Sequence, residues 1–131
     1  MKTLCIVPCG HKKIWGKNPN AGPVAARNIY IGVFAKKCQE YALTFYPSSY
    51  CILSAKYGFL WPDDVVQGPY EVTFKKSSTN PISKKELIEI AHQKYLFDFN
   101  QIIIIIAGKE YVKIIEEIFP GKKIHKPLIN C

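Results

Sequence analysis

The sequence predicts a single α/β domain in which a mainly parallel sheet of about four strands carries helices on its faces, a Rossmann-like arrangement. The 131 residues are enough for one compact core, so residues 1–131 are expected to form one domain. Short apolar runs alternate with segments whose apolar residues recur at helical spacing, as parallel sheets require. The isoleucine run at 102–106 is typical of a central strand covered on both faces.

The first half of the chain is expected to contain two strands joined by a loop and a helix. Residues 4–7 form an apolar run ended by a proline and a glycine, which is typical of a short strand that enters a loop. That loop, 11–23, is long and polar. Residues 24–45 place apolar side chains at helical spacing and predict an amphipathic helix, in which Gly32 weakens the middle. Residues 50–53 predict a second buried strand.

The second half is expected to add two helices and two strands. Residues 61–70 carry two turn signals and predict an irregular connection. Ser83, followed three residues later by Glu86, forms a capping box that opens a predicted helix over 84–95. A strand at 102–106, a helix at 109–119 and a short strand at 123–125 complete the predicted order.

The segments that follow the three main strands are the expected binding region. In open α/β sheets, ligands bind beyond the carboxyl ends of the strands. Each exit contains a glycine, which lets backbone amides approach an anion, and a lysine, which adds charge. The alternative is that these glycines are ordinary turn residues after strands and that a lysine-rich chain places lysines there by chance. The predicted binding residues are Gly10 and Lys13 at the first exit, Ser54, Lys56, Tyr57 and Gly58 at the second, and Gly108, Lys109 and Tyr111 at the third.

Cys9 is the cysteine with the strongest chemical prediction. It follows the first strand in a glycine-containing loop beside His11 and two lysines, a setting that favours the thiolate. Cys9 is therefore a candidate nucleophile, and the alternative is an unreactive cysteine that supports the turn. Cys5 and Cys51 fall inside predicted strands and are expected in the core.

Asp64 is the candidate general acid or base. Asp63 and Asp64 are adjacent carboxylates after the second exit, and neighbouring acids can differ in pKa or bind a divalent ion together with phosphate oxygens. The alternative is that the pair starts a turn. Tyr70, together with Tyr57, is expected to position a base. The spacing of the cysteines and histidines does not fit a structural zinc site, so no metal or cofactor is predicted.

The charge balance indicates an anionic partner. The chain has 18 Lys and Arg against 10 Asp and Glu, a formal charge of +8, and Arg27 is its one arginine. Lysine acts as a mobile point charge, which suits phosphate better than the bidentate reading of bases. The longest apolar run is far shorter than a membrane span, so no membrane partner is expected. The lack of a signal-like apolar segment and the odd number of cysteines, five, favour the cytoplasm.

The segment 54–70 resembles the motif of the YaaA family of peroxide-stress proteins. The matching positions are Tyr57, Gly58, Leu60, Pro62, Asp64, Pro69 and Tyr70, with Gly68 as an insertion. Lys56 departs from the family, which has an apolar residue at that position. This resemblance implies a DNA-binding protein that acts in oxidative stress.

A closer resemblance is to small prokaryotic and phage proteins that are labelled YaaA-like. These share Cys9, Gly10 and Lys13 at the first exit, Ser54, Ala55, Lys56, Gly58 and Leu60 at the second, Pro69 with Tyr70, and Ala107, Gly108 and Tyr111 at the third. The group continues past its last strand with a glycine-rich segment and another helix, whereas this chain stops at Cys131. A site completed by such a segment is therefore expected to be absent.

These observations predict a protein that binds a nucleotide or nucleic acid in a crevice at the strand exits. Its enzymatic extension is chemistry on a nucleobase or its glycosidic bond, with Asp64 as acid or base, Tyr70 as positioning group and Cys9 as nucleophile. The residues leave open whether the protein is an enzyme. The alternatives are a DNA-binding stress-response protein without chemistry, which uses its lysines as an electrostatic surface, and a sensor of nucleoside phosphates.

Overall fold

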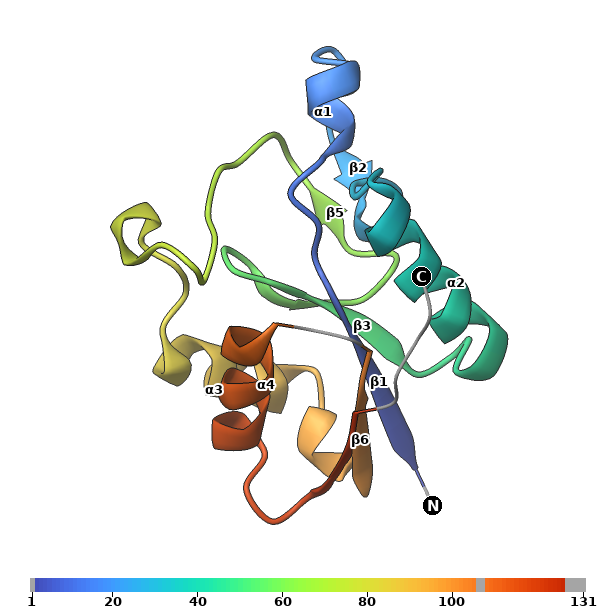
Figure 1. Cartoon of the computed structure of the whole chain (residues 1–131), viewed down its shortest axis with the longest axis vertical. Coiled ribbons are helices and arrows are strands. Elements are labelled where there is room, and N and C mark those ends of the chain that lie inside the picture. The colour runs from blue at the N-terminus through green and yellow to red at the C-terminus, as the bar shows by residue number, and fades with distance from the viewer. Residues whose placement is uncertain (1, 106–107, 127–131) are drawn as a thin grey trace.

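The computed structural model describes residues 2–105 and 108–126, and it contains a five-stranded sheet with helices on both faces (Figure 1). The sheet order is β4-β3-β1-β6-β7. All neighbouring strands are parallel except β3 and β4, which are antiparallel. The predicted α/β class and mainly parallel sheet are therefore confirmed. The strands are β1 (Thr3–Pro8), β3 (Tyr50–Ser54), β4 (Gly58–Leu60), β6 (Gln101–Ile104) and β7 (Lys123–His125).

The chain changes direction across the sheet at β1. From β1 it passes through α2 (Val33–Phe45) to β3 on one side, and later through α3 (Lys84–Gln93) to β6 on the other side. From β6 it continues through α4 (Lys109–Ile118) to β7. Right-handed connections that run in opposite directions place their helices on opposite faces, which accounts for α2 on one face and α3 with α4 on the other (Figure 1). This reversal makes the β1–β6 pair the expected ligand-binding point of the sheet.

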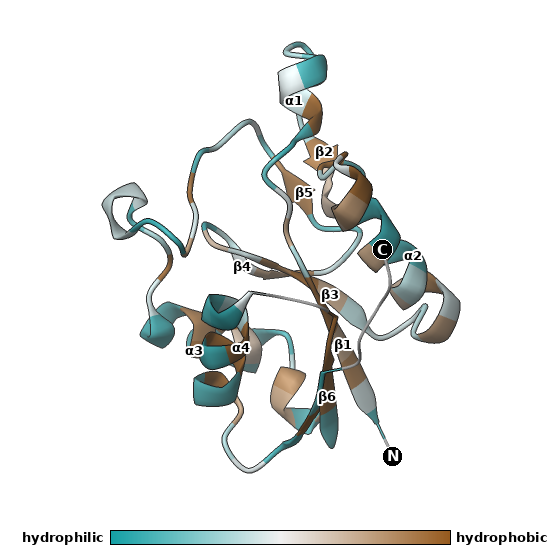
Figure 2. Ribbon diagram, viewed as in Figure 1, coloured by the Kyte–Doolittle hydropathy of each residue, from teal (hydrophilic) through white to brown (hydrophobic). Residues whose placement is uncertain are grey.

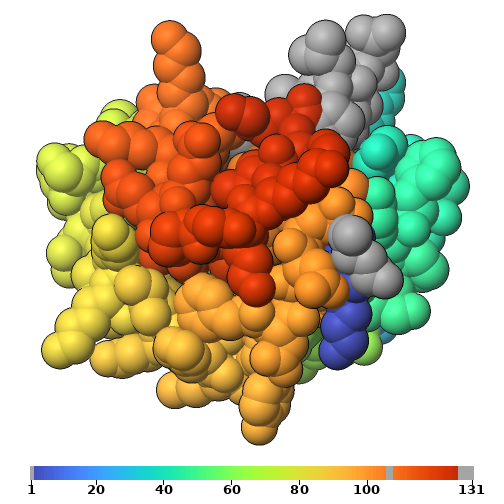
Figure 3. Space-filling view, turned by 90° about the horizontal axis from the view of Figure 1, so that it is seen from below, coloured from blue at the N-terminus to red at the C-terminus, as the bar shows by residue number. Residues whose placement is uncertain are grey.

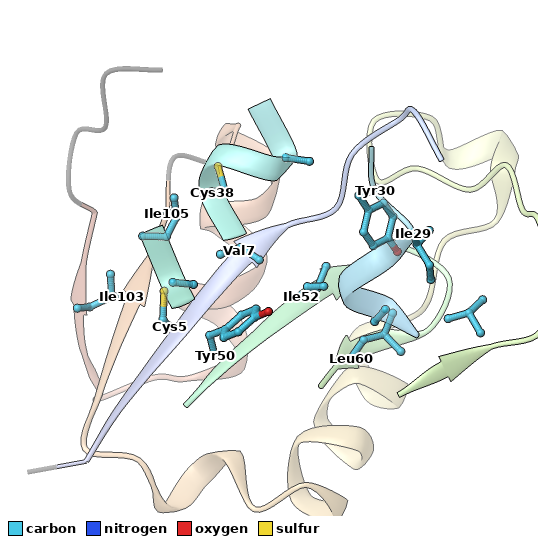
Figure 4. Close-up of a cluster of buried hydrophobic side chains, with 14 of the residues drawn as sticks. Cys5, Val7, Ile29, Tyr30, Cys38, Tyr50, Ile52, Leu60, Ile103 and Ile105 are labelled. Atoms are coloured by element: carbon cyan, nitrogen blue, oxygen red, sulfur yellow. The ribbon is translucent and has the colours of Figure 1, made fainter. Parts of the chain in front are cut away.

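The sheet buries both of its faces, and alternate residues of each central strand face different helices. Leu4 and Ile6 of β1 pack in the cluster with α3 and α4. Cys5 and Val7 pack in the cluster with Cys38 of α2, as Figure 4 shows. Figure 2 shows the central strands as the most apolar part of the fold. A fully buried aliphatic side chain of this kind stabilises the fold by about 1.5–3 kcal/mol.

The buried cysteines of the central strands are core residues, as predicted. Cys5 and Cys51 have no exposed surface. Burial raises the pKa of Cys5 to about 12, and Cys38 adds to the increase. Burial likewise raises the pKa of Cys51. These two thiols are therefore neutral packing groups at physiological pH.

The predicted helix over 24–45 is wrong over residues 24–32. Residues 24–28 form the short strand β2 (Val24–Ala25) and the 3-10 turn η1 (Ala26–Asn28), and α2 begins only after Gly32. Ile29 and Tyr30 are buried because this segment pairs with the loop after β1: the Ile14 amide donates to the Ile29 carbonyl at 2.7 Å. Contacts with a distant segment thus outweigh the helical spacing of the apolar residues.

The loop over 11–23 is more ordered than its polarity predicts. It contains the short helix α1 (Ile14–Lys17), whose Trp15 side chain is 5% exposed. Trp15 Nε1 donates to the carbonyl of Gly22 at 2.8 Å, which closes the loop. The connection after β4 likewise contains β5 (Val65–Val66), which pairs antiparallel with β2.

The helices and strands of the second half agree with the prediction at most positions. Ser83 caps α3, since its Oγ accepts from the Glu86 amide at 3.1 Å. The helix ends at Gln93 rather than at Tyr95, which has a φ of 60° and is 73% exposed. The remaining elements are the 3-10 turns η2 (Ser77–Thr79) and η3 (Leu96–Asp98). Ile106 and Ala107, predicted as the end of the isoleucine strand and the start of its exit, lie outside the described residues.

The face at the amino ends of the strands is covered by the last third of the chain. Figure 3 shows α4 and β7 in orange and red across the middle of this face, with α2 in teal at its margin. Within residues 2–105 and 108–126, no helix has both the length and the apolar character needed to cross a membrane.

Candidate functional site

The exits of β1, β3 and β6 meet at the carboxyl end of the sheet. The Cys9 amide donates to the carbonyl of Leu53, the last residue of β3 but one, at 3.3 Å. Cys9 Sγ lies 3.2 Å from the hydroxyl oxygen of Tyr111, in the first turn of α4 after β6. Cys9 and Tyr111 thus mark the point where the strand order reverses.

A second cluster of hydroxyl groups joins the exit of β3 to the segment before α2. Ser54 Oγ accepts from the amides of Lys56 at 3.2 Å and Tyr57 at 3.1 Å. It also lies 3.2 Å from the hydroxyl oxygen of Tyr70. Because the two amides occupy both lone pairs of the serine oxygen, the serine proton donates to Tyr70. The Tyr70 hydroxyl also contacts the hydroxyl of Tyr30, which is 1% exposed.

Two lysines from different exits lie beside the same tyrosine ring. Lys13 Nζ is 4.7 Å from the centroid of the Tyr70 ring, and Lys56 Nζ is 5.8 Å from it. Lys56 Nζ is also 5.3 Å from the centroid of Tyr57, whose ring meets that of Tyr70 edge-on. The negative faces of these rings attract the ammonium groups and hold positive charge at the site.

The tyrosines of the site are neutral at physiological pH. Burial raises the pKa of Tyr70 to about 12, and the nearby Cys9 adds to the increase. Burial also raises the pKa of Tyr30, where the neighbouring Tyr70 contributes, and of Tyr111, where Cys9 contributes. These hydroxyl groups therefore donate and accept hydrogen bonds rather than carry charge.

Two adjoining cavities border this site and together are called the exit crevice below. The first cavity has a volume of about 660 Å³ and is lined by Cys9, Gly10, Gly108 and Tyr111, among others. The second has a volume of about 940 Å³ and is lined by Trp15, Tyr70 and neighbouring residues. Both are lined by His11, Lys12, Lys13 and Glu71, so they share one wall. The volume of the first cavity is typical of a small-molecule site.

Gly10 keeps the first exit close to α2. A Cβ atom added at Gly10 would lie 3.1 Å from the Cβ of Ala35, which is tighter than an ordinary contact. A side chain at this position would therefore push the loop that carries Cys9 away from the helix.

Gly58 has a structural role rather than a place in the crevice. Its φ is +77°, and an added Cβ would lie 2.8 Å from the Ile90 Cδ1 of α3. Gly58 begins β4, so the predicted second exit is a tight hairpin between β3 and β4. Lys109, predicted at the third exit, is exposed in the first turn of α4 and does not line either cavity of the exit crevice.

The structure does not bring Asp64 to the crevice. Because β4 runs antiparallel to β3, the turn after it returns toward the amino end of the sheet. There the Asp64 carboxylate accepts from the Trp61 amide at 2.8 Å and pairs with Lys94 at the end of α3. Asp63 forms a surface ion pair with Arg27. The two carboxylates thus stabilise a turn. This agrees with the alternative given for the pair in the sequence, that it starts a turn and has no part in catalysis.

The sequence interpretation missed residues that line the crevice or contact its tyrosines. Tyr30 lay inside the predicted helix, although Gly32 after it and Pro23 before that stretch are signals of a break. Lys75 and Lys76 line the first cavity from the segment 71–80, which has no strand pattern. Phe74 of the same segment meets the Tyr111 ring edge-on, with 5.4 Å between centroids.

The described parts of the chain contain no group of three or more His, Cys, Asp or Glu side chains that could hold a metal ion. The polar side chains that line the crevice include six lysines, two tyrosines, the Cys9 thiol, His11, two threonines and one carboxylate, that of Glu71. This donor set suits an anionic or aromatic ligand.

Comparison with known proteins assigns the chain to a family. Residues 4–130 match the model described as a family of unknown function (DUF6884). The chain belongs to this family. All three exits lie within the matched residues, so the exit crevice is part of the shared family region.

Two groups of relatives are also similar in sequence. Over 118 residues the chain is 42% identical to "Uncharacterized protein YfjM" of Bacillus subtilis (strain 168), covering 90% of this chain and 77% of that protein. Over 110 residues it is 30% identical to UPF0246 protein lpp1320 of Legionella pneumophila (strain Paris), covering 79% of this chain and 41% of that protein. The chain therefore spans less than half the length of this longer relative.

The similarity to UPF0246 proteins confirms the distant relation to the YaaA family that the segment 54–70 predicts. UPF0246 protein lpg1366, from the Philadelphia 1 strain of Legionella pneumophila, matches with the same identity and coverage. No solved structure matches the chain.

Proposed function

We propose that the protein binds a phosphate-containing ligand, a nucleotide or nucleic acid, in the exit crevice. The observation that carries this proposal is the position of two ammonium groups from separate strand exits, Lys13 and Lys56, beside the ring of Tyr70. Lys13 and Tyr70 line the exit crevice, and Lys56 lies beside it. Neither lysine forms an ion pair with a described carboxylate, so their charge is available to an anion. The location at the reversal of strand order supports the same proposal.

The other crevice residues have complementary roles in this proposal. Gly10 and Gly108 both line the first cavity, and Gly10 lets the backbone of the first exit pass close to Ala35. Tyr70 accepts hydrogen bonds from Ser54 and Tyr30, which leaves its own proton for the ligand. Tyr57, which is partly exposed beside the crevice, offers a ring on which a base can stack.

The enzymatic extension of the proposal is chemistry on a nucleobase or its glycosidic bond. Tyr70 is its candidate proton donor, and Cys9, held by Tyr111, is its candidate nucleophile. Asp64 is left out of this chemistry because its carboxylate is paired with Lys94 and the Trp61 amide.

Binding without chemistry is the second candidate function, as in a DNA-binding protein of the oxidative-stress response. The placement of Asp64 away from the crevice favours it, since no described carboxylate contacts Cys9 or Tyr70. In this case the lysines act only as an electrostatic surface.

A thermal-shift measurement with nucleotides, nucleosides, bases and inorganic phosphate tests the proposal. A nucleotide at 100 times its dissociation constant should stabilise the protein by about 2.7 kcal/mol. Lys13→Ala with Lys56→Ala should remove this stabilisation. Lys84→Ala with Lys85→Ala, an equal charge change on the exposed start of α3, should preserve it. If neither a nucleotide nor an oligonucleotide stabilises the wild-type protein, the proposal is wrong.

Product analysis separates the two candidate functions. Incubation of the protein with the nucleotide that stabilises it should release free base if the enzymatic extension is correct. Tyr70→Phe and Cys9→Ser should then abolish release while binding persists. Binding with no product would favour the second candidate.

A further inference from the structure

The exit crevice carries more positive charge than one nucleotide can neutralise. Six lysines line its two cavities: Lys12, Lys13, Lys17, Lys36, Lys75 and Lys76. Glu71 is the one carboxylate among these lining residues. The two ion pairs found in the described ranges, Arg27–Asp63 and Lys94–Asp64, involve none of the six lysines. A ligand with several phosphates would relieve the repulsion among these ammonium groups.

The two cavities adjoin one another along the residues that they share. They share the segment His11–Lys13 as a common wall, with about 660 Å³ on one side and about 940 Å³ on the other. A single nucleotide site has a volume within about 300–1,000 Å³, so the first cavity alone would satisfy a mononucleotide. The second cavity, with Lys17 and Lys36, extends the basic surface beyond that ligand.

The segment 71–80 holds two of the lysines in a defined position. The Thr79 hydroxyl oxygen accepts from the Thr73 amide at 3.0 Å, and the hydroxyl donates to the Lys76 carbonyl at 2.7 Å. Phe74 packs edge-on against Tyr111, which fixes the segment to α4. Lys75 and Lys76 therefore face the crevice from a wall built by internal hydrogen bonds, not from an unsupported tail.

A partly exposed aromatic ring at the start of α2 also lines the first cavity. Phe34 lines this cavity and is 43% exposed, whereas Tyr111 in the same lining is 9% exposed. Alternation of basic groups with an exposed ring is the arrangement that binds unpaired nucleotides, because lysines contact the backbone and the ring stacks on a base. A duplex keeps its bases stacked on one another, so it cannot offer one to Phe34.

We infer that the exit crevice binds a single strand of nucleic acid that passes through both cavities, with Phe34 as a stacking platform and Lys75 and Lys76 as phosphate contacts. This inference rests on the proposed function and specifies its ligand as a strand rather than a mononucleotide. DNA and RNA share the phosphodiester chemistry on which it depends.

Fluorescence anisotropy with labelled oligothymidylates and oligouridylates of increasing length tests the inference, with a duplex of the same length for comparison. Affinity should rise with length until the crevice is filled, and the single strand should bind at least about tenfold more tightly than the duplex. The two single-strand series distinguish DNA from RNA. For single strands, the salt dependence should decrease by about 1.4 in slope when Lys75→Ala and Lys76→Ala remove two phosphate contacts.

Two variants make the test specific. Phe34→Ala should weaken single-strand binding by about tenfold, since stacking on one ring contributes roughly that factor or more. Lys84→Ala with Lys85→Ala, outside the crevice, should leave affinity and salt slope unchanged. Circular dichroism of each variant establishes that it folds.

The outcomes separate this inference from the proposed function. If duplex binds as tightly as single strand, or if the Lys75 and Lys76 variant behaves like the Lys84 and Lys85 variant, the inference is overturned. Loss of mononucleotide binding in the Lys13 and Lys56 variant would still support the proposed function. If neither mononucleotides nor oligonucleotides bind the wild-type protein at low salt, both fall together.

Discussion

The sulfur of Cys9 lies 3.2 Å from the hydroxyl oxygen of Tyr111, although the two residues are 102 positions apart in the chain. Cys9 follows β1, and Tyr111 follows β6 in the first turn of α4. Phe74 packs against the other side of this contact through the Tyr111 ring. One hydrogen bond thus connects the two central strand exits and the wall of the first cavity.

Removing the Tyr111 hydroxyl should destabilise the protein and slow the reaction of Cys9. Tyr111→Phe should lower the free energy of unfolding by about 0.5–1.5 kcal/mol, the net contribution of one hydrogen bond. Donation from this hydroxyl to the reactive thiolate form of Cys9 would stabilise that form, so we expect its loss to slow alkylation of Cys9 by iodoacetamide by about tenfold. Urea unfolding and mass spectrometry of the peptide that contains Cys9 measure the two effects.

Tyr95→Phe is the matched control, because the Tyr95 side chain is 73% exposed and lies outside both cavities. Its free energy of unfolding should stay within about 0.5 kcal/mol of the wild type. Unchanged or faster alkylation of Cys9 in Tyr111→Phe would contradict donation from the tyrosine to the thiolate.

The buried tyrosines should make the protein less stable in alkali. Unfolded tyrosine loses its proton near a pKa of about 10, while folded Tyr70 keeps it up to about 12. In this window the unfolded state binds fewer protons, so the free energy of unfolding falls as pH rises, by up to about 1.4 kcal/mol per pH unit for each such group. Tyr70→Phe should make the decline shallower in urea unfolding between about pH 9 and about pH 11.5. If the free energy of unfolding fell equally steeply with pH in the wild type and in Tyr70→Phe, the raised pKa of Tyr70 would not be the cause of the decline.

Asp64 should matter for stability and not for ligand binding. Asp64→Asn should cost about 1–3 kcal/mol, because it leaves the partly buried Lys94 ammonium without its carboxylate and weakens the bond from the Trp61 amide. Asp63→Asn is the control: its side chain is 81% exposed, so the change should stay within about 0.5 kcal/mol. If the Asp64 variant lost nucleotide binding while it remained folded, Asp64 would have a role in ligand binding after all.

The hairpin glycine of the YaaA-like motif should be a stability determinant. Gly58→Ala should lower the free energy of unfolding by about 1–3 kcal/mol, since φ is +77° and the new methyl group would meet Ile90. Gly68→Ala has no atom within 4 Å of its added Cβ and should change stability by less than about 0.5 kcal/mol. Equal effects of the two substitutions in urea unfolding would show that the hairpin tolerates a side chain.

The sheet could be predicted from the sequence because its strands are buried on both faces. A continuous β-branched run such as Ile102 to Ile105 predicts a central strand. The capping box of Ser83 and Glu86 predicts the start of α3. The parallel order then follows from the alternation of strands and helices.

The misassigned segments are those whose conformation depends on distant partners. The apolar residues 24–31 have helical spacing, but Tyr30 pairs with Lys13 and contacts Tyr70, so the α-helix begins only after Gly32. Asp64 follows a strand in sequence yet lies at the other end of the sheet, because β4 reverses direction. Sequence spacing does not encode that reversal, since the turn at Gly58 looks like any strand exit.

Because Cys9 and Tyr111 are far apart in the chain, the crevice cannot form until the ribosome has synthesised the start of α4. At a translation rate of about 5–20 residues per second, the β1 exit is made roughly 5–20 seconds before the α4 residue that completes it. A ligand therefore has no assembled crevice to bind on a nascent chain. Under the proposed function, capture of the ligand would report that β6 has joined the sheet, and a bound ligand would slow the departure of that strand.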